Sequence, residues 1–281
     1  MTGELCKLFC SCYPQFNMTP ERFGSLLVSG DSHVITHNES GVLTGFVITE
    51  GAALRLICVA PEHRHRGIGR LLLSEAEGYI ASQGFRTVFT GGVSSRFLIG
   101  ADKASWGFFE GQGYTSVGGC DEMLIRLKDF TFDESRFKGH KTARYGWYNG
   151  DPETLRKAVA EVDEDWVQYF EDGCRCYAAT VEGETASFCL VSYDAQNYLT
   201  DAFGRVGMPG CVGTVPKYRG KGIGIELVAR VTEHLKNEGM DISFIFFTGV
   251  ADWYRKLGYE VFVTEVFGRK DFDQNTKEET V

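Results

Sequence analysis

Two arginine–glycine loops in the sequence have the residue types and spacing needed to bind a phosphate. The first reads R-H-R-G-I-G at residues 64–69, and the second reads R-G-K-G-I-G at residues 219–224. A strand-like run precedes each loop, and a helix-like apolar repeat follows it. The N–H groups of a helix N-terminus, glycines that permit close approach and an arginine together favour an anion. The sequence therefore predicts two sites for a ligand that carries a phosphate or pyrophosphate.

Two familiar phosphate-binding motifs do not fit these loops. A P-loop requires G-x-x-x-x-G-K-[ST], which neither loop contains. A dinucleotide-binding G-x-G-x-x-G fingerprint fails because its third glycine falls on Leu72 in the first loop and on Ile225 in the second. The loops therefore indicate another kind of phosphate site.

The two loops belong to an internal repeat in which matching positions are 155 residues apart. Pro61 and Pro216 precede the loops, and the helix expected after each loop stops near a glycine. An apolar strand, a short aromatic helix and a final strand complete each copy. We therefore expect two mixed α/β domains, at residues 1–130 and 131–281, with their boundary in the charged stretch 128–141.

The residues around the loops carry a resemblance to a known family. Each R-x-x-G-x-G has V-x-P or T-x-P before it, and each aromatic helix ends in F-x-x-x-G-Y or Y-x-x-x-G-Y. This combination resembles motif A of the GNAT acetyltransferases over nearly the whole chain. It implies two tandem GNAT folds, each a mixed, mostly antiparallel sheet flanked by helices, and acetyl-CoA as acyl donor. The residues that would hold its pyrophosphate are Arg64, His65, Arg66, Gly67, Ile68 and Gly69 in the first copy and Arg219, Gly220, Lys221, Gly222, Ile223 and Gly224 in the second.

The resemblance also implies a difference in chemistry between the two copies. GNAT enzymes transfer the acyl group directly to an amine, and a tyrosine near the start of the last short helix often protonates the departing thiolate. The matching position is Tyr254 in the second copy and Phe109 in the first. Phenylalanine lacks the proton, and general acid catalysis contributes about 10²–10⁴-fold. We therefore expect catalysis in the C-terminal copy, with Tyr254 as the catalytic residue.

In this family a backbone N–H polarises the thioester carbonyl where the strand before the loop parts from its neighbour. We expect a bulge there, since the second copy has a glycine at that place. The residues assigned to this cofactor contact are Val212, Gly213 and Thr214 in the second copy and Ile57, Cys58 and Val59 in the first.

The general base is not assigned, although Asp201 and Glu265 are candidates by their location. Cys211 is expected to be a core residue rather than a nucleophile, because no histidine lies near it in sequence. The first copy carries an insertion at residues 91–105, which could form a lid or a domain contact.

The composition sets limits on partners and location. A net charge of −9 argues against a general role on nucleic acid. The sequence has neither an apolar run long enough for a membrane span nor a secretory signal, so we expect a cytoplasmic protein without a membrane partner. His33 and His37 lack a carboxylate at ligand spacing and no pair of C-x-x-C motifs occurs, so no metal site is expected.

Three functions stay open at this point. The first is an acetyl-CoA-dependent N-acetyltransferase active in the C-terminal copy, the second has the N-terminal copy or both copies active, and the third is a non-catalytic acetyl-CoA-binding or regulatory protein. The acceptor is expected to be a small primary amine. A loose similarity to bacterial glucosamine-type acetyltransferases suggests an amino sugar. We expect a monomer or a homodimer.

Overall fold

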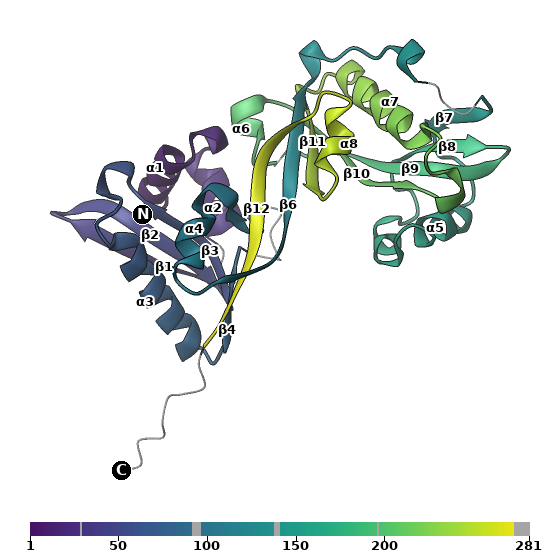
Figure 1. Ribbon diagram of the computed structural model, residues 1–281. Helices are drawn as coiled ribbons and strands as arrows, with labels where there is room; N and C mark the ends of the chain where they lie inside the picture. The colour runs from purple at the N-terminus through teal and green to yellow at the C-terminus, as the bar shows by residue number, and fades with distance from the viewer. Residues whose placement is uncertain (29, 92–96, 138–140, 196, 273–281) are drawn as a thin grey trace. The chain divides into compact units, whose positions relative to one another are not determined.

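The computed structural model describes the chain except for residues 29, 92–96, 138–140, 196 and 273–281. The chain divides into two compact units (Figure 1). The N-terminal unit comprises Met1–Cys120 and the segment that begins at Val263, and the C-terminal unit comprises Asp121–Phe262. These units differ from the continuous halves 1–130 and 131–281, because the chain crosses between the units at two places.

The N-terminal unit has a sheet in the order β1-β2-β3-β4-β12. Its strands pair antiparallel except β3 and β4, which are parallel. Its elements are α1 (Thr2–Cys12), η1 (Pro14–Phe16), α2 (Pro20–Leu27), β1 (Ser32–Glu39), β2 (Val42–Glu50), β3 (Ala53–Val59), η2 (Pro61–His63), α3 (Ile68–Ser82), β4 (Thr87–Thr90), β5 (Ala101–Asp102), η3 (Lys103–Ser105), α4 (Trp106–Glu110), the first half of β6 (Thr115–Arg126) and most of β12 (Glu260–Asp271).

The C-terminal unit repeats this pattern in the order β6-β11-β10-β9-β8-β7. Here β10 and β11 form the parallel pair. Its elements are the second half of β6, η4 (Leu127–Asp129), η5 (Glu134–Arg136), β7 (Ala143–Trp147), α5 (Pro152–Ala160), η6 (Glu164–Tyr169), β8 (Cys176–Val181), β9 (Glu184–Tyr193), α6 (Thr200–Phe203), β10 (Val206–Thr214), η7 (Pro216–Tyr218), α7 (Ile223–Asn237), β11 (Ile242–Thr248) and α8 (Ala251–Arg255). The expectation of mixed, mostly antiparallel sheets flanked by helices is confirmed.

Helices cover both faces of each sheet, as neighbouring residues of one strand show. On β2, a Cβ at Gly45 would meet Leu72 of α3, whereas the ring of Phe46 contacts Phe23 of α2. Successive side chains of a strand point to opposite faces, so α2 and α3 lie on opposite sides of the sheet. In the C-terminal unit, Phe188 of β9 packs with α5, and Cys189 packs in the cluster of α7.

The last strand of each repeat is exchanged between the units. Residues 121–126 of β6 pair with β11, from Asp121 opposite Thr248 to Arg126 opposite Ile242. Residues 269–271 of β12 pair with β4, and Glu265 lies opposite Asp102 of β5. Each sheet is therefore completed by a strand that follows the aromatic helix of the other repeat.

The stretch 128–141, expected as the boundary, belongs to the C-terminal unit where it is described. Phe130 is buried in the cluster of α7, and Glu134 pairs with Arg230 of that helix. Residues 138–140 lie outside the described part of the chain. No helix among the described residues has the length and apolar character needed to cross a bilayer.

Candidate active sites

Both arginine–glycine loops fold as helix N-termini that open to free space. The residue before α3 is Gly67, with φ +89°, and the residue before α7 is Gly222, with φ +79°. A Cβ at either glycine would meet no atom within 4 Å. Positive φ is costly for other residues, so these glycines let the chain enter the helix with its first N–H groups unobstructed. Both loops therefore fit a phosphate ligand.

The two loop arginines take the same position in the two units. Arg64 donates a hydrogen bond from Nε to the Val59 carbonyl at 3.1 Å, and Arg219 donates one to the Thr214 carbonyl at 3.0 Å. Each bond ties the loop to the end of the preceding strand through one N–H of the guanidinium. The arginines therefore brace the loops as well as supply charge beside them.

The remaining loop positions differ in kind. His65 has φ +60°, where the second loop has Gly220 at φ +75°, so the first loop is the more strained by about 1–2 kcal/mol. Arg66 lies 4.0 Å from Glu39, and the Lys221 ammonium lies 5.1 Å from the centre of the Tyr218 ring. The isoleucines that begin α3 and α7, Ile68 and Ile223, have buried side chains. These isoleucines could therefore contact a phosphate only through the backbone.

The parallel strands in front of each loop pair briefly and then part. β3 and β4 pair at Ala53 with Phe89 and at Leu54 with Thr90. β10 and β11 pair at two positions, Val206 with Ile242 and Gly207 with Ser243. Within the described residues, neither pair continues toward the loop. On one side, the N–H and C=O groups of β3 and of β10 are thus no longer paired with the parallel strand. A ligand that lies between the strands needs such groups as hydrogen-bond partners.

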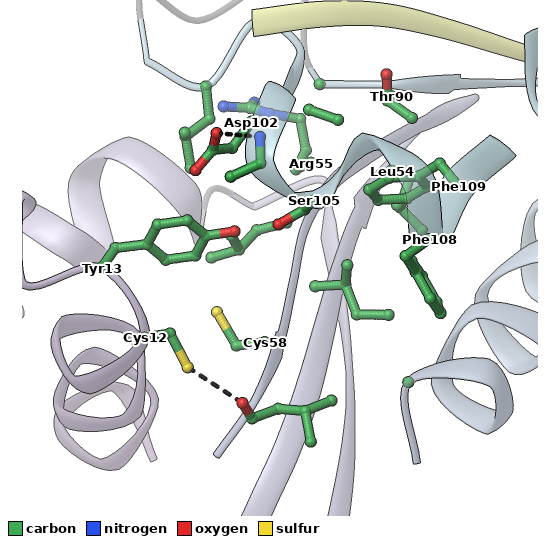
Figure 2. A pocket seen from close by; sticks show the side chains of 18 of the residues that line it. Cys12, Tyr13, Leu54, Arg55, Cys58, Thr90, Asp102, Ser105, Phe108 and Phe109 are labelled. Atoms are coloured by element: carbon green, nitrogen blue, oxygen red, sulfur yellow. Dashed lines mark hydrogen bonds between the residues drawn. The ribbon is translucent and has the colours of Figure 1, made fainter. Parts of the chain in front are cut away.

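In the N-terminal unit this opening is a cavity of about 740 Å³. Its walls come from the end of α1, from β3, from the loop and from the segment between β5 and α4 (Figure 2). Its polar groups include Arg55, Asp102 and Ser105. The expected cofactor residues that line it are Ile57, Cys58, Val59, Arg64, His65, Gly67 and Gly69.

The aromatic position of the last short helix is equivalent in the two units. Phe109 packs in the cluster that contains Ile57, and Tyr254 packs in the cluster that contains Val212. Ile57 and Val212 are matching positions of the repeat. Tyr254 therefore packs beside the strand that leads to the second loop, and it lies near the end of α8 rather than at its start.

The Tyr254 ring is buried, between Trp253 and Tyr259. Burial raises the pKa of its hydroxyl well above the usual range, and the nearby Cys189, Tyr259 and Cys211 act in the same direction. The phenol consequently stays protonated at neutral pH. The hydroxyl is therefore present in the form that can donate a hydrogen bond or a proton.

The N-terminal unit has a different phenol at its opening. Tyr13, which follows α1, lines the cavity, and its hydroxyl points toward Ser105 (Figure 2). Burial raises the pKa of Tyr13, whereas a hydrogen bond with Ser105 lowers it. A phenol from α1's C-terminal end therefore lines the same cavity as Phe109.

The strand bulges lie earlier than expected. The β9–β10 register shifts at Cys211 and Val212, and the β2–β3 register shifts at Arg55. Gly213 pairs regularly with Phe188, whose ring would lie 2.2 Å from a Cβ at this position. Packing of Phe188 therefore requires the glycine, and the expectation that it forms the bulge was wrong. Cys58 and Val59 are likewise regularly paired with β2.

The bulge in β10 is strained and lies beside a carboxylate. Cys211 has φ +44°, a conformation that costs a non-glycine residue about 1–3 kcal/mol and is often kept at functional sites. Burial raises the pKa of the Cys211 thiol to about 11, and the charge of Asp163 contributes. Asp163, the residue before η6, therefore acts on the β10 bulge, which lies four residues beyond the last pair of β10 with β11.

The structure shows a buried carboxyl that the sequence did not single out. Glu122 of β6 is 1% exposed and accepts a hydrogen bond from the Tyr198 hydroxyl. Burial raises its pKa to about 7, against the opposing effect of that hydrogen bond. Its Oε1 atom has no hydrogen-bond partner in the described part of the chain. The neighbouring Asn197 donates to the sulfur of Met208, on β10 just past its last pair with β11. Glu122 is thus linked through Tyr198 to the segment that contacts β10 at Met208.

The two carboxylates expected from their location do not fit the C-terminal site. Asp201 is exposed on α6. Glu265 is buried, but it pairs with β5 in the N-terminal unit. The strand exchange is the reason, since it places Glu265 in one unit and Glu122 in the other. Nothing in the local sequence of Glu122 signals its burial, which depends on Tyr198.

Comparisons with known proteins agree with this geometry. A family model of the acetyltransferase (GNAT) domain matches residues 139–262, and a second model with the same description matches residues 11–122. The chain therefore belongs to the GNAT acetyltransferase family and is an acyltransferase with two GNAT domains in tandem. This family uses acetyl-CoA as the acyl donor. Both matches end close to the places where the chain crosses between the units.

Solved structures share the tandem fold. A glucosamine N-acetyltransferase region of a fungal multi-domain β-N-acetylglucosaminidase has a TM-score of 0.70 at 18% identity, with coverage of 96% of this chain and 37% of that one. A GCN5-related N-acetyltransferase from Sphaerobacter thermophilus has a TM-score of 0.68 at 18% identity, with coverage of 96% and 92%. A tandem GNAT protein from the clavulanic acid pathway has a TM-score of 0.60 at 14% identity, with coverage of 96% and 94%. A sequence search of curated proteins gave no match.

Proposed function

We propose that the protein transfers the acetyl group of acetyl-CoA to a primary amine and that transfer takes place in the C-terminal unit. The position of Tyr254 carries this proposal. Its side chain packs in the cluster that contains Val212 of the β10 bulge, in the same unit as the loop with glycines at positions 220, 222 and 224. The N-terminal unit has the loop and the cavity but has Phe109 at the equivalent place.

The C-terminal unit has a group for each requirement of direct transfer. The N–H groups at the start of α7, with Arg219, hold the pyrophosphate. The backbone of β10 beyond its last pair with β11 polarises the acyl carbonyl. Tyr254 donates a proton to the departing thiolate, and Glu122, with its pKa of about 7, accepts one from the amine.

The acceptor is a cationic amine in this proposal. The chain has a net charge of −9, and Asp163 places a carboxylate near the β10 bulge. Such a charge attracts an ammonium group before its deprotonation. An amino sugar is a suitable class, since the first of the structural relatives above is named for glucosamine N-acetylation.

The test is a screen of primary amines, including glucosamine, with acetyl-CoA, read by release of free thiol. We expect at least one amine to give turnover above the rate of acetyl-CoA hydrolysis, with mass spectrometry confirming an N-acetyl product. Absence of turnover with every amine, together with tight acetyl-CoA binding, would instead support the non-catalytic function.

Transfer in the N-terminal unit is a second candidate, favoured by one observation. Its cavity of about 740 Å³ joins the first loop to Tyr13, Asp102 and Ser105. In this alternative, Tyr13 would donate the proton that Phe109 cannot. The two candidates are separated by removing each phenolic hydroxyl in turn.

A further inference from the structure

Two of the nine cysteines meet at the wall of the N-terminal cavity. Cys12 is the last residue of α1, and Cys58, one of the expected cofactor residues, lies on β3 (Figure 2). The two side chains face the same space in this wall, and the protonated Cys12 thiol donates a hydrogen bond to the Val59 carbonyl at 3.4 Å. Each thiol affects the titration of the other, although the two cysteines are 46 positions apart in sequence.

The surroundings make the two thiols chemically different. The hydrogen bond from Cys58 and the neighbouring Arg64 guanidinium lower the pKa of Cys12 to about 6, despite its partial burial. Burial raises the pKa of Cys58 well above its usual range, and the adjacent Cys12 sulfur acts in the same direction. At neutral pH the pair is thus a thiolate next to a thiol. The thiolate is the form that reacts with oxidants.

The other cysteines of α1 have different surroundings. Cys6 and Cys10 both direct their thiols to the carbonyl of Met18, at 3.4 and 3.8 Å. Neither of them lines the cavity. Cys10 is half-buried, as Cys12 is. Cys10 is therefore a control cysteine of similar exposure that lies outside the cavity wall.

We propose that Cys12 and Cys58 form a peroxide-sensitive dithiol that closes to a disulfide in the wall of the N-terminal cavity. The Cys12 thiolate attacks one peroxide oxygen, the O–O bond breaks, and the leaving hydroxide takes a proton to become water. The resulting Cys12 sulfenic acid is attacked by the Cys58 sulfur, which loses its proton as the second water leaves. The two thiols lose two electrons, and one hydrogen peroxide is reduced to two waters.

Closure of this disulfide would alter the phosphate site of the same unit. Arg64 would lose the thiolate beside it, and the end of α1 would be bonded to the strand between Ile57 and Val59. We therefore expect oxidation to weaken acetyl-CoA binding at the first loop. This consequence rests on the proposed function, whereas formation of the disulfide does not.

The experiment uses the full chain with one equivalent of hydrogen peroxide, followed by non-reducing peptide mass spectrometry. We expect a cross-link between the peptides of Cys12 and Cys58, with loss of two hydrogens. It should form equally in Cys10→Ser, which also makes the assignment unambiguous, and should be absent in Cys12→Ser and Cys58→Ser. Cross-links of Cys12 to another cysteine, or an intact dithiol after peroxide treatment, would overturn the proposal.

A second readout does not require oxidation. The rate of iodoacetamide labelling at Cys12 should rise with pH through a midpoint of about 6 in the Cys10→Ser background. In Cys58→Ser, where a hydroxyl replaces the thiol, the midpoint should change because the Cys58 bond is the largest influence on this pKa. A midpoint near 9 in both variants would contradict the thiolate–thiol pair. Acetyl-CoA binding by the oxidised and reduced protein then tests the consequence separately.

Discussion

The N-terminal and C-terminal units share an arginine–glycine loop, an arginine that ties this loop to the preceding strand, and two parallel strands that separate in front of the loop. They differ in the residues around the opening between those strands. The C-terminal unit has Tyr254 on its last short helix and a buried Glu122. The N-terminal unit has Phe109 there, and its cavity is lined by Tyr13, Cys12 and Cys58. The repeat therefore preserves the elements proposed to bind a phosphate, while the groups proposed to transfer protons differ between the two units.

The largest effect is expected when a negative charge is placed in one of the two arginine–glycine loops. Gly222→Asp places a carboxylate at the open start of α7, where it would repel a pyrophosphate. We expect this variant to lose acetyl transfer altogether. Gly67→Asp should remove binding at the first loop and leave transfer largely intact.

The measurements are turnover and the stabilisation of the protein by acetyl-CoA, which for one site is about 2.7 kcal/mol at a concentration of 100 Kd. Gly222→Ala is the matched control, since it shares the strain at φ +79° and adds no charge. Loss of transfer in Gly67→Asp with full transfer in Gly222→Asp would assign catalysis to the N-terminal unit.

A smaller effect is expected at the carboxyl that distinguishes the C-terminal unit. Glu122 must be ionised to accept a proton, so kcat/KM should rise with pH through about 7. Glu122→Gln should lower the rate by about 10²-fold and remove this rise. Asp201→Asn is the control, because Asp201 is an exposed carboxylate that should not affect the profile. An unchanged profile in Glu122→Gln would exclude it as the base.

The same substitution has a stability signature with a defined sign. The pKa of Glu122 is raised from 4.5 to about 7, so the folded state binds more protons than the unfolded state between these pH values. The free energy of unfolding of the wild type should therefore fall with rising pH in this window, by up to about 3 kcal/mol from this group. Glu122→Gln should lack that decrease in chemical denaturation at pH 5 and pH 8.

How much the sequence predicts depends on whether a feature is local. The loops and the two helix starts were predictable because Gly67 and Gly222 are required by their own backbone conformation. The strand exchange was not predictable. β6 and β12 each follow a glycine–tyrosine pair and each have 12 residues, so local sequence does not specify which sheet either strand joins.

The same distinction between local and long-range features applies to the residues of the candidate site. Tyr254 was singled out by the Y-x-x-x-G-Y pattern and the family resemblance, but Glu122 and the Cys12–Cys58 pair depend on contacts between segments far apart in sequence. Gly213 was correctly associated with the strand before the loop and wrongly with its bulge. Its real constraint is the ring of Phe188 on a neighbouring strand. The insertion at 91–105 contributes Asp102 and Ser105 to the cavity, whereas its residues 92–96 lie outside the described part of the chain.

The most direct test of transfer in the C-terminal unit compares Tyr254→Phe with Tyr13→Phe, using the amine found in the screen. Each change removes one buried hydroxyl and keeps the ring, so folding and acetyl-CoA affinity should be nearly unchanged. We predict that kcat falls by about 10²–10⁴-fold in Tyr254→Phe and stays close to the wild-type value in Tyr13→Phe. Wild-type turnover in Tyr254→Phe, with the loss appearing in Tyr13→Phe, would contradict the account and place transfer in the N-terminal cavity.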